Sequence, residues 1–283
     1  MCRFVLYLGP SIPLGTLITE PAHSLIRQSL QSRHHVQPVN GDGFGVAWYV
    51  PEIGPEATLF RSVFPAWNNQ NLIQLARVTG SSCILAHVRA ATPGFPVTET
   101  NCHPFTSGPY AFMHNGDVGG FQQVRRALLS SLSDESFAAI KGSTDSEHLF
   151  AVFLDCLGEL RTLNSGKALA EALRQTIKRA TSLVREHQIT EHSYLNLAVS
   201  DGRRATVARF TTDREEQALS LFLHTGKRYV CENGVCRMVD PESGREAVIV
   251  SSEPLSRDPG WTTVPHNHLV IVEEDRSVTV EPI

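Results

Sequence analysis

The second residue of the chain, Cys2, brings together two groups that could do chemistry. If the initiator Met1 is removed, Cys2 carries a thiol and a free α-amine on the same residue. An unperturbed α-amine has a pKa of roughly 7.7–8.0, so near neutral pH part of it is unprotonated and can act as a base. A deprotonated thiol is a strong nucleophile. Cys2 could therefore attack a carbonyl without help from a histidine. The structural alternative is a small apolar residue that opens a buried strand.

Three later stretches supply groups that such a nucleophile would need. Arg89 ends an apolar stretch, where an arginine can bind a carboxylate through two parallel hydrogen bonds or form a surface salt bridge. Asn115 and Gly116 could form an oxyanion hole, although Asn-Gly is also the leading hairpin turn. Asp145 belongs to a Ser-Thr-Asp stretch at a predicted helix start, where it could cap the helix or bind an ammonium group. An arginine, an aspartate and a thiol together suit an α-amino acid whose side-chain carbonyl reaches the thiol.

The composition excludes several other classes of function. Of the 283 residues, 41% are hydrophobic and 19% are charged, a balance that can bury a sizeable core. The net charge of −4 and the absence of a long basic block argue against a nucleic-acid partner. No apolar run of about 18 residues and no secretory leader are present, so we expect no membrane segment and a cytoplasmic location. In that compartment the six cysteines are expected to be reduced thiols.

The expected elements do not follow a regular βαβ alternation, which favours an α+β architecture with antiparallel sheets inside and helices outside. We expect residues 1–283 to form one domain. A long loop at 91–106 is expected to be functional, as loops of that length often are. Hydrophobic periodicity predicts helices at 21–32, 71–78, 121–132, 145–160 and 168–187. Short apolar runs rich in β-forming residues predict strands at 3–8, 44–50, 59–63, 82–89, 110–114, 194–199, 206–210, 219–224, 247–251, 269–272 and 277–280.

Seven short stretches, in the same order along nearly the whole chain, resemble one family. They resemble the class II glutamine amidotransferases, which have the N-terminal nucleophile hydrolase fold. The resemblance implies a four-layer αββα sandwich of two antiparallel sheets. It is closest to the stand-alone branch that includes the fungal glutathione-degrading amidotransferase subunit and the γ-glutamyl hydrolase of ergothioneine biosynthesis. The stretches are Met-Cys-Arg at 1–3, 40–48, 87–92, 101–105, 114–116, 143–147 and Ser-Ser-Glu-Pro-Leu at 251–255.

The resemblance implies a role for each residue singled out above. Cys2 would be the nucleophile, and Asn115 with Gly116 would form the oxyanion hole. Arg89 would clamp the α-carboxylate of the substrate, and Asp145 would bind its α-ammonium group.

Further consequences of the resemblance concern the pocket around these groups. Thr92 and His103 would line the γ-glutamyl pocket, and residues 43–45 would pack as backbone against the nucleophile. Many family members have a tryptophan after the clamp arginine, whereas this chain has Ala90. This departure is compatible with a pocket open to a γ-glutamyl group that bears something bulkier than ammonia.

The function expected from these observations is hydrolysis of a γ-glutamyl amide, in glutathione or another γ-glutamyl conjugate, through a thioester on Cys2. One alternative is a glutaminase subunit that supplies ammonia to a partner synthase. A second is an inactive scaffold that uses the fold to bind. The expected partner is a small-molecule γ-glutamyl substrate, and a peptidase-like or synthase subunit and a homo-oligomer are open alternatives. No membrane partner and no cofactor are expected.

Two remaining patterns are assigned to structural roles. The histidines at 34–35 and at 266 and 268 lack a carboxylate or cysteine ligand at suitable spacing, so no metal site is expected. Cys231 and Cys236 flank Glu-Asn-Gly, which predicts a hairpin with two cross-strand thiols.

Overall fold

The computed structural model of the protein describes residues 2–32, 39–91, 94–232, 234–240 and 246–283. Two large antiparallel sheets form its centre. The seven-stranded sheet has the order β13 (Thr262–Thr263), β9 (Phe222–Gly226), β12 (Ala247–Ser251), β1 (Arg3–Pro13), β4 (Gly80–Val88), β2 (Phe44–Tyr49) and β3 (Ala57–Ser62). The six-stranded sheet has the order β15 (Val278–Pro282), β14 (His268–Val272), β8 (Ala205–Thr211), β7 (Tyr194–Ser200), β6 (Tyr110–Asp117) and β5 (Phe105–Ser107).

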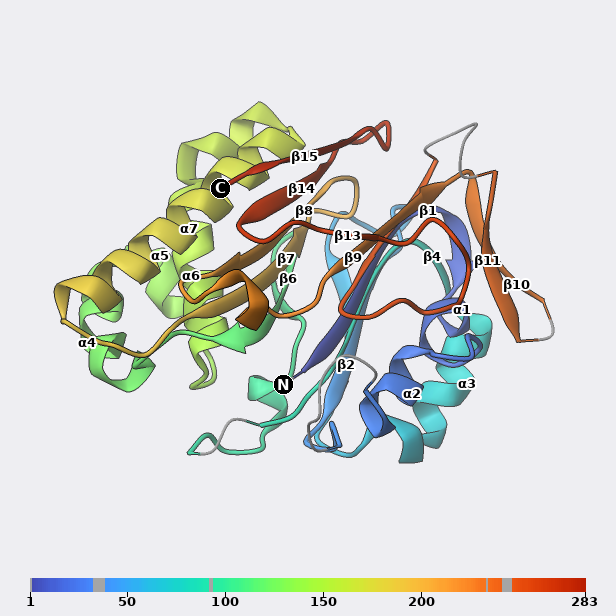
Figure 1. The fold of residues 1–283 in the computed structure, drawn as a ribbon, viewed down its shortest axis with the longest axis horizontal. Coiled ribbons are helices and arrows are strands. Elements are labelled where there is room, and N and C mark those ends of the chain that lie inside the picture. The colour runs from blue at the N-terminus through green and yellow to red at the C-terminus, as the bar shows by residue number, and fades with distance from the viewer. Residues whose placement is uncertain (1, 33–38, 92–93, 233, 241–245) are drawn as a thin grey trace.

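The helices form two groups, one on the outer face of each sheet, as Figure 1 shows. The layers therefore run helices, sheet, sheet, helices, and the predicted α+β sandwich is confirmed. Against the seven-stranded sheet lie α1 (Gly15–Ile18), α2 (Leu25–Leu30) and α3 (Gln70–Val78). Beside the six-stranded sheet lie α4 (Phe121–Ser130), α5 (Asp134–Ala138), α6 (Asp145–Leu157) and α7 (Gly166–Glu186).

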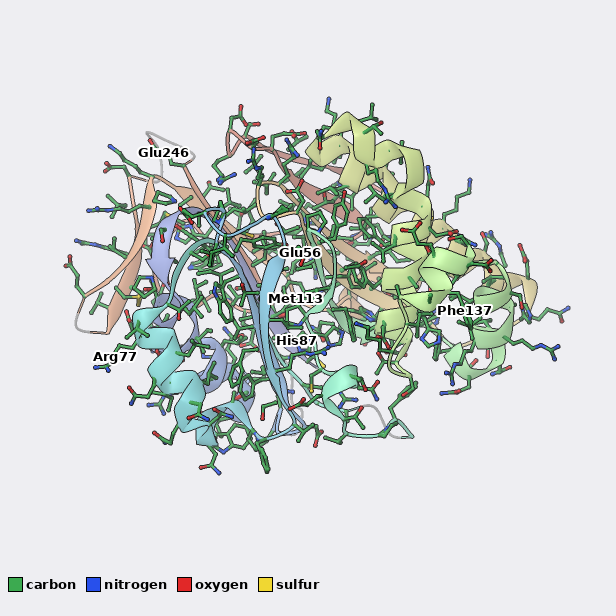
Figure 2. The ribbon with its side chains drawn as sticks, turned by 180° about the vertical axis from the view of Figure 1, so that it is seen from behind. Glu56, Arg77, His87, Met113, Phe137 and Glu246 are labelled. Atoms are coloured by element: carbon green, nitrogen blue, oxygen red, sulfur yellow. A yellow bond between two sulfur atoms is a disulfide. The ribbon has the colours of Figure 1, made fainter. Side chains whose placement is uncertain are left out.

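Alternation of side chains along the strands decides which residues face the space between the sheets. In β1, Phe4, Leu6 and Leu8 belong to the core between the sheets, whereas Val5 and Tyr7 face α1–α3. The same period puts Leu85 of β4 and Met113 of β6 between the sheets. His87 and Met113 can be followed there in Figure 2. By this alternation Cys2, Arg89 and Asn115 continue the rows that face between the sheets.

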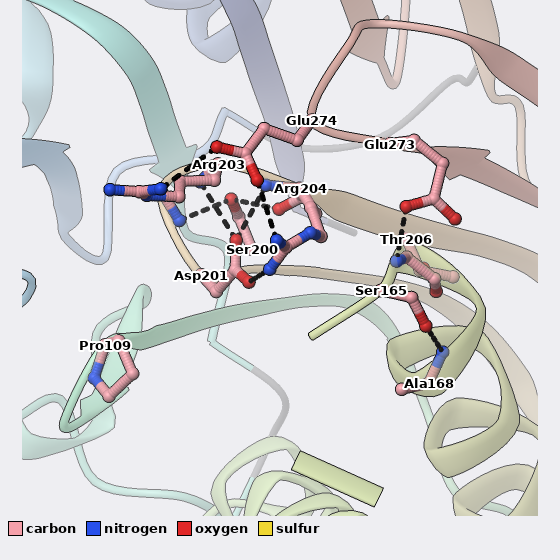
Figure 3. A network of polar contacts seen from close by, with 12 residues as sticks. Pro109, Ser165, Ala168, Ser200, Asp201, Arg203, Arg204, Thr206, Glu273 and Glu274 are labelled. Atoms are coloured by element: carbon pink, nitrogen blue, oxygen red, sulfur yellow. Dashed lines mark hydrogen bonds and ion pairs between the residues drawn. The ribbon is translucent and has the colours of Figure 1, made fainter. Parts of the chain in front are cut away.

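The carboxylate of Glu273, at the turn between β14 and β15, fastens the outer helix α7 to its sheet (Figure 3). Glu273 accepts hydrogen bonds from the backbone N–H of Gly166 (2.8 Å) and Lys167 (3.3 Å) at the start of α7. Negative charge is favourable at a helix N-terminus, where backbone N–H groups lack partners within the helix. Next to it, Glu274 pairs with Arg203 and Arg204 on the exposed surface.

Two glycines, Gly45 in β2 and Gly43 just before it, let a loop approach the sheet closely. A Cβ on Gly45 would lie 2.2 Å from the carbonyl oxygen of His103, and a Cβ on Gly43 would lie 2.6 Å from Cys102 Sγ. Residues 102 and 103 therefore rest directly on the backbone at the start of β2. Arg61 of the neighbouring strand donates to the Cys102 carbonyl at 3.1 Å and holds the same loop.

Several elements differ from the sequence predictions. The helix expected from residue 21 begins at Leu25, because Ser24 caps it by accepting the Arg27 N–H. The strand expected to end at residue 8 continues to Pro13, since Ile12 pairs with Ser81 after a shift in register. The described part of the chain contains no helix that is both long and apolar enough to cross a bilayer.

The expectation that all six cysteines are reduced is wrong for one pair. Cys231 and Cys236 lie opposite each other in the hairpin of β10 (Arg228–Glu232) and β11 (Val235–Val239) and are joined by a disulfide. The hairpin itself was predicted correctly. Directly opposed residues of an antiparallel pair have neighbouring Cβ atoms, which brings two thiols within bonding reach. Cys2, Cys83, Cys102 and Cys156 are free.

Replacing Gly45 with alanine should destabilise the fold by about 1–3 kcal/mol, because the added methyl group overlaps the His103 carbonyl. The measurement is the free energy of unfolding in denaturant. The matched control is Gly54→Ala, since a Cβ at Gly54 meets no heavy atom within 4 Å. Equal stability of the two variants would show that the loop does not rest on β2.

Candidate active site

Cys2 lies just before β1 at one end of the space between the sheets. Cys2 is a half-buried residue, and its thiol donates a long hydrogen bond (3.5 Å) to the carbonyl of Ala90. Burial raises the pKa of the Cys2 thiol above its ordinary value, while this hydrogen bond and the charges of Arg89 and Arg3 act in the opposite direction. The thiol therefore needs a base to become a nucleophile at neutral pH.

Arg89 follows β4 and is buried, although it carries a charge. Its backbone is held by the turn that precedes β2. The Arg89 N–H donates to Gly43 (2.8 Å), and its carbonyl accepts the N–H of Asp42 (3.0 Å). The Asp42 carboxylate also accepts the N–H of Ala91 at 2.8 Å. In the guanidinium, Nη2 donates a long bond to Pro96 (3.4 Å), whereas Nη1 is buried and has no partner among the described residues. This geometry leaves a fixed cationic donor that can bind a carboxylate.

Asn115 and Gly116 belong to β6 and not to a hairpin turn. They pair with Asn196 and Leu195 of β7, and the ladder continues to Asp117. Gly116 has a φ of 139°, and a Cβ there would lie 1.8 Å from the Tyr194 carbonyl oxygen. Only glycine fits this position. The Asn115 side chain is buried, and its Oδ1 has no partner among the described residues. An amide and a glycine backbone are thus held side by side on a rigid strand.

Asp145 lies in the first turn of α6, but it is not the cap of that helix. Thr144 takes the cap position by accepting the N–H of Glu147. Asp145 is therefore free to hold other groups, and it accepts the backbone N–H of Val118 (2.9 Å) and of Ser146 (2.8 Å). Its carboxylate ties α6 to the loop that follows β6.

Asn101 connects this helix start to the long loop. It accepts the N–H of Ser143 (2.9 Å) and donates to the carbonyl of Pro96 (2.9 Å). The same carbonyl receives Nη2 of Arg89. The arginine and the start of α6 are therefore linked through one loop.

Three carboxylates, that of Asp145 among them, line a cavity of about 310 Å³. Burial raises the pKa of Asp117, and the neighbouring charge of Asp145 raises it further. Such a cavity favours a cationic group, because a cation relieves the repulsion between the carboxylates. The lining includes Asp117, Asp145, Glu191, Phe95, Phe121 and Gly120.

Three histidines form a buried layer next to these groups. His87 Nε2 lies 3.1 Å from the carbonyl of His114, so this nitrogen must carry the proton and donate. The His87 ring stacks on His103 with 4.1 Å between centroids. Burial lowers the pKa of His87 to about 3 and that of His103 well below its ordinary value. Both histidines are therefore neutral near pH 7, and both ring nitrogens of His103 lack partners among the described residues.

The roles predicted for individual residues stay predictions, although most of these residues gather at one end of the sandwich. Thr92 lies outside the described residues, so its predicted place in the γ-glutamyl pocket has no structural account. Among the described residues no group of three or more His, Cys, Asp or Glu side chains could hold a metal ion. The pair at 34–35 is likewise outside the described part.

Sequence reasoning missed four residues that shape the site. They lie inside or directly after the stretches singled out above, but nothing in the sequence indicates what each contacts. Asp42 holds the arginine, Asn101 links the loop to α6, Asp117 lines the cavity, and His87 supports His103.

Comparison with known proteins adds independent information. The family described as glutamine amidotransferases class-II matches residues 16–282. The probable glutamine amidotransferase DUG3 of Saccharomyces cerevisiae is 40% identical over 305 residues, covering 100% of this chain and 84% of the yeast protein. The gamma-glutamyl-hercynylcysteine sulfoxide hydrolase of Mycolicibacterium smegmatis is 27% identical over 285 residues, covering 100% of both chains.

Solved structures agree with this result. A glutamine aminotransferase class-II domain protein from Silicibacter pomeroyi has a TM-score of 0.67 and 29% identity, covering 100% of this chain and 99% of that one. An allosteric regulatory enzyme of purine biosynthesis has a TM-score of 0.60 at 18% identity, covering 100% of this chain and 49% of that one, and supports the fold alone. The resemblance predicted from the seven stretches is confirmed.

The buried histidines should make the protein sensitive to acid. As pH falls from 6.5 towards 3, the unfolded chain binds a proton at His87 that the folded chain does not. The free energy of unfolding must therefore decrease over this range. His87→Gln keeps an N–H donor for the His114 carbonyl but removes the titration, so its stability should fall less steeply with acid.

The measurement is denaturant unfolding of both proteins across that pH range. His187→Gln serves as the control, because His187 is an exposed histidine at the end of α7. Identical pH slopes for the wild type and His87→Gln would contradict the assignment of His87 as a buried neutral group.

Proposed function

The chain belongs to the class II glutamine amidotransferases, an enzyme family, and from this premise we propose that it hydrolyses a γ-glutamyl amide bond with Cys2 as the nucleophile. The observation that carries the proposal is the placement of the thiol of half-buried Cys2 near a buried guanidinium, that of Arg89, whose Nη1 has no partner among the described residues. A thiol beside a fixed carboxylate receptor suits an amino acid held by its α-carboxylate.

The proposed reaction begins with removal of Met1, which frees the α-amine of Cys2. This amine accepts the thiol proton, and the sulfur bonds to the γ-carbonyl carbon. The amide of Asn115 and the N–H of Gly116 donate to the resulting oxyanion, each donor contributing about 10²–10³ in rate. The C–N bond then breaks, and the leaving amine takes the proton from the α-ammonium group of Cys2. Water attacks the γ-glutamyl thioester, which releases glutamate and restores the thiol.

The two charged ends of the γ-glutamyl group have separate receptors in this proposal. Arg89 binds the α-carboxylate through its planar fork. Asp145 binds the α-ammonium group, supported by the carboxylate-lined cavity next to it. We further propose that Thr92 and His103 line the pocket between these ends.

The leaving group is proposed to be larger than ammonia. Ala90 follows the clamp arginine, and its small side chain leaves space beside the clamp. The relative from Mycolicibacterium smegmatis is named for a γ-glutamyl conjugate. We therefore propose a γ-glutamyl peptide or thiol conjugate, with glutathione as the first candidate. The second candidate is glutamine, with ammonia passed to a partner, and the name of the yeast relative favours it.

Replacing either receptor should lower kcat/KM on a γ-glutamyl substrate. Arg89→Lys replaces a planar fork with a point charge that cannot bind both carboxylate oxygens in the same way. Asp145→Asn removes the charge that faces the ammonium group. Losing a hydrogen bond to a charged group costs about 1.5–3 kcal/mol, which corresponds to roughly a tenfold to hundredfold loss.

The control variants make the same two substitutions, arginine to lysine and aspartate to asparagine, at exposed positions. Arg77→Lys on α3 and Asp134→Asn on α5 should leave the kinetics unchanged. Wild-type kinetics in both Arg89→Lys and Asp145→Asn would mean that the pocket lies elsewhere.

A substrate comparison tests the proposed function itself. The values of kcat/KM are measured for glutathione, a γ-glutamyl anilide and glutamine on protein whose N-terminus has been verified by mass spectrometry. We expect glutathione or the anilide to be cleaved better than glutamine, with no turnover by Cys2→Ala. A clear preference for glutamine would favour the ammonia-supplying alternative, and turnover by Cys2→Ala would exclude the mechanism.

A further inference from the structure

Arg3, the residue after Cys2, extends into a buried polar network on the opposite face of β1 from the thiol. Its Nε donates to Glu253 Oε1 at 2.8 Å, and its Nη2 donates to Ser32 Oγ at 2.6 Å. Its Nη1 donates to the backbone carbonyl of Cys2 at 2.7 Å. The Arg3 and Glu253 side chains are only 2% and 0% exposed. One guanidinium thus joins the backbone of the proposed nucleophile to a buried carboxylate.

Glu253 is itself held in place from several sides. The residue before it, Ser252, extends the ladder between β12 and β1, because its N–H donates to the Phe4 carbonyl and its Oγ accepts the Phe4 N–H, both at 3.0 Å. The second carboxylate oxygen of Glu253 lies 2.7 Å from His23 Nε2. Ser32 donates to the first oxygen at 2.6 Å. The carboxylate therefore has little freedom to move.

The hydrogen bond from Arg3 to the Cys2 carbonyl lies at the N-terminal end of β1. The strand β1 begins at Arg3, whose partner in β4 is Val88, so Cys2 stands just outside the element. On the other face, the thiol has the long bond to the Ala90 carbonyl. The short hydrogen bond from Arg3 to the Cys2 carbonyl thus restrains the backbone of Cys2, and with it the position from which the thiol projects.

Stability alone does not explain this arrangement. Burying an ion pair removes two charges from water, and apolar residues of similar volume are often as stabilising or more so. A planar guanidinium that donates to Glu253, Ser32 and the Cys2 carbonyl does, however, fix geometry, because its donors are held in one rigid fork.

We propose that Glu253 is a positioning residue that acts through Arg3 to hold Cys2 in the orientation needed for attack. The proposal rests on the proposed function in one respect, namely that Cys2 is the nucleophile. Glu253 does not touch the substrate; it fixes the guanidinium, and the guanidinium fixes the Cys2 carbonyl.

The main alternative is that Glu253 only balances the charge of Arg3, and the two ideas predict opposite results. If Glu253→Gln acts by charge alone, the uncompensated guanidinium stabilises the thiolate, so iodoacetamide modifies Cys2 faster and hydrolysis is not slowed. If Glu253 positions Cys2, hydrolysis slows while KM changes little.

The experiment compares Glu253→Gln and Arg3→Lys with the wild type, using a γ-glutamyl anilide as substrate and iodoacetamide as thiol probe. Arg3→Lys keeps the charge but cannot donate to Glu253, Ser32 and the Cys2 carbonyl in one planar fork. We expect kcat to fall about tenfold to hundredfold in both variants, with KM near the wild-type value. Glu274→Gln and Arg203→Lys, in the exposed ion pair of Figure 3, are matched controls that should leave kcat unchanged.

A double variant guards against simple unfolding. Arg3→Met with Glu253→Gln removes both charges, so neither is left buried and unpaired, and its melting temperature should recover relative to Glu253→Gln. We expect its kcat to stay low. Wild-type kcat in the folded double variant, or in folded Arg3→Lys, would overturn the proposal.

The thiol probe separates this proposal from the proposed function. The rate of Cys2 modification, followed by peptide mass spectrometry, needs no substrate. If the wild type cleaves no γ-glutamyl compound, the proposed function fails. An altered modification rate in Arg3→Lys, which keeps the charge, would then still support positioning, and an unchanged rate would contradict it.

Discussion

The antiparallel register of β1 and β4 fixes the candidate site, because it pairs Arg3 with Val88 and so brings Cys2 opposite Arg89. The side-chain period in a strand is two, so a one-residue slip of either strand would turn its own side chain, Cys2 or Arg89, to the face opposite the other. On the far side of β4, the register with β2 places the Gly43 backbone against Arg89. Two ladders therefore align the proposed nucleophile and the proposed carboxylate receptor.

The candidate site contains buried polar atoms that have no hydrogen-bond partner among the described residues, which folded proteins normally avoid. Arg89 Nη1, Asn115 Oδ1 and the ring nitrogens of His103 are buried without partners among the described residues, and such atoms usually cost stability. Glycine contacts at Gly45 and Gly116 keep the surrounding backbone close-packed around them. Departures from good packing and pairing are expected where function competes with stability.

Much of the fold could be predicted because its signals are local. The mostly apolar runs of β1, β4 and β7 and the helical spacing of apolar residues along the length of α7 indicate where these elements lie. The ordered short stretches gave the family and the sandwich. Asn115 and Gly116 were harder to place, since an Asn-Gly pair favours a turn on local grounds, and only pairing with β7 shows that the pair continues a strand.

Contacts between distant residues could not be predicted. Glu253 reaches Arg3 across 250 positions, and the bond between Cys231 and Cys236 depends on a cross-strand register that the sequence does not state.

The central claim is that Cys2, freed of Met1, carries the γ-glutamyl group during turnover. The direct measurement is mass spectrometry of the N-terminal peptide from protein that is acid-quenched while it hydrolyses a γ-glutamyl substrate. The account predicts a peptide that begins with Cys2 and bears a γ-glutamyl adduct on its sulfur. A fully active protein that retains Met1, or an adduct on any other residue, would contradict it.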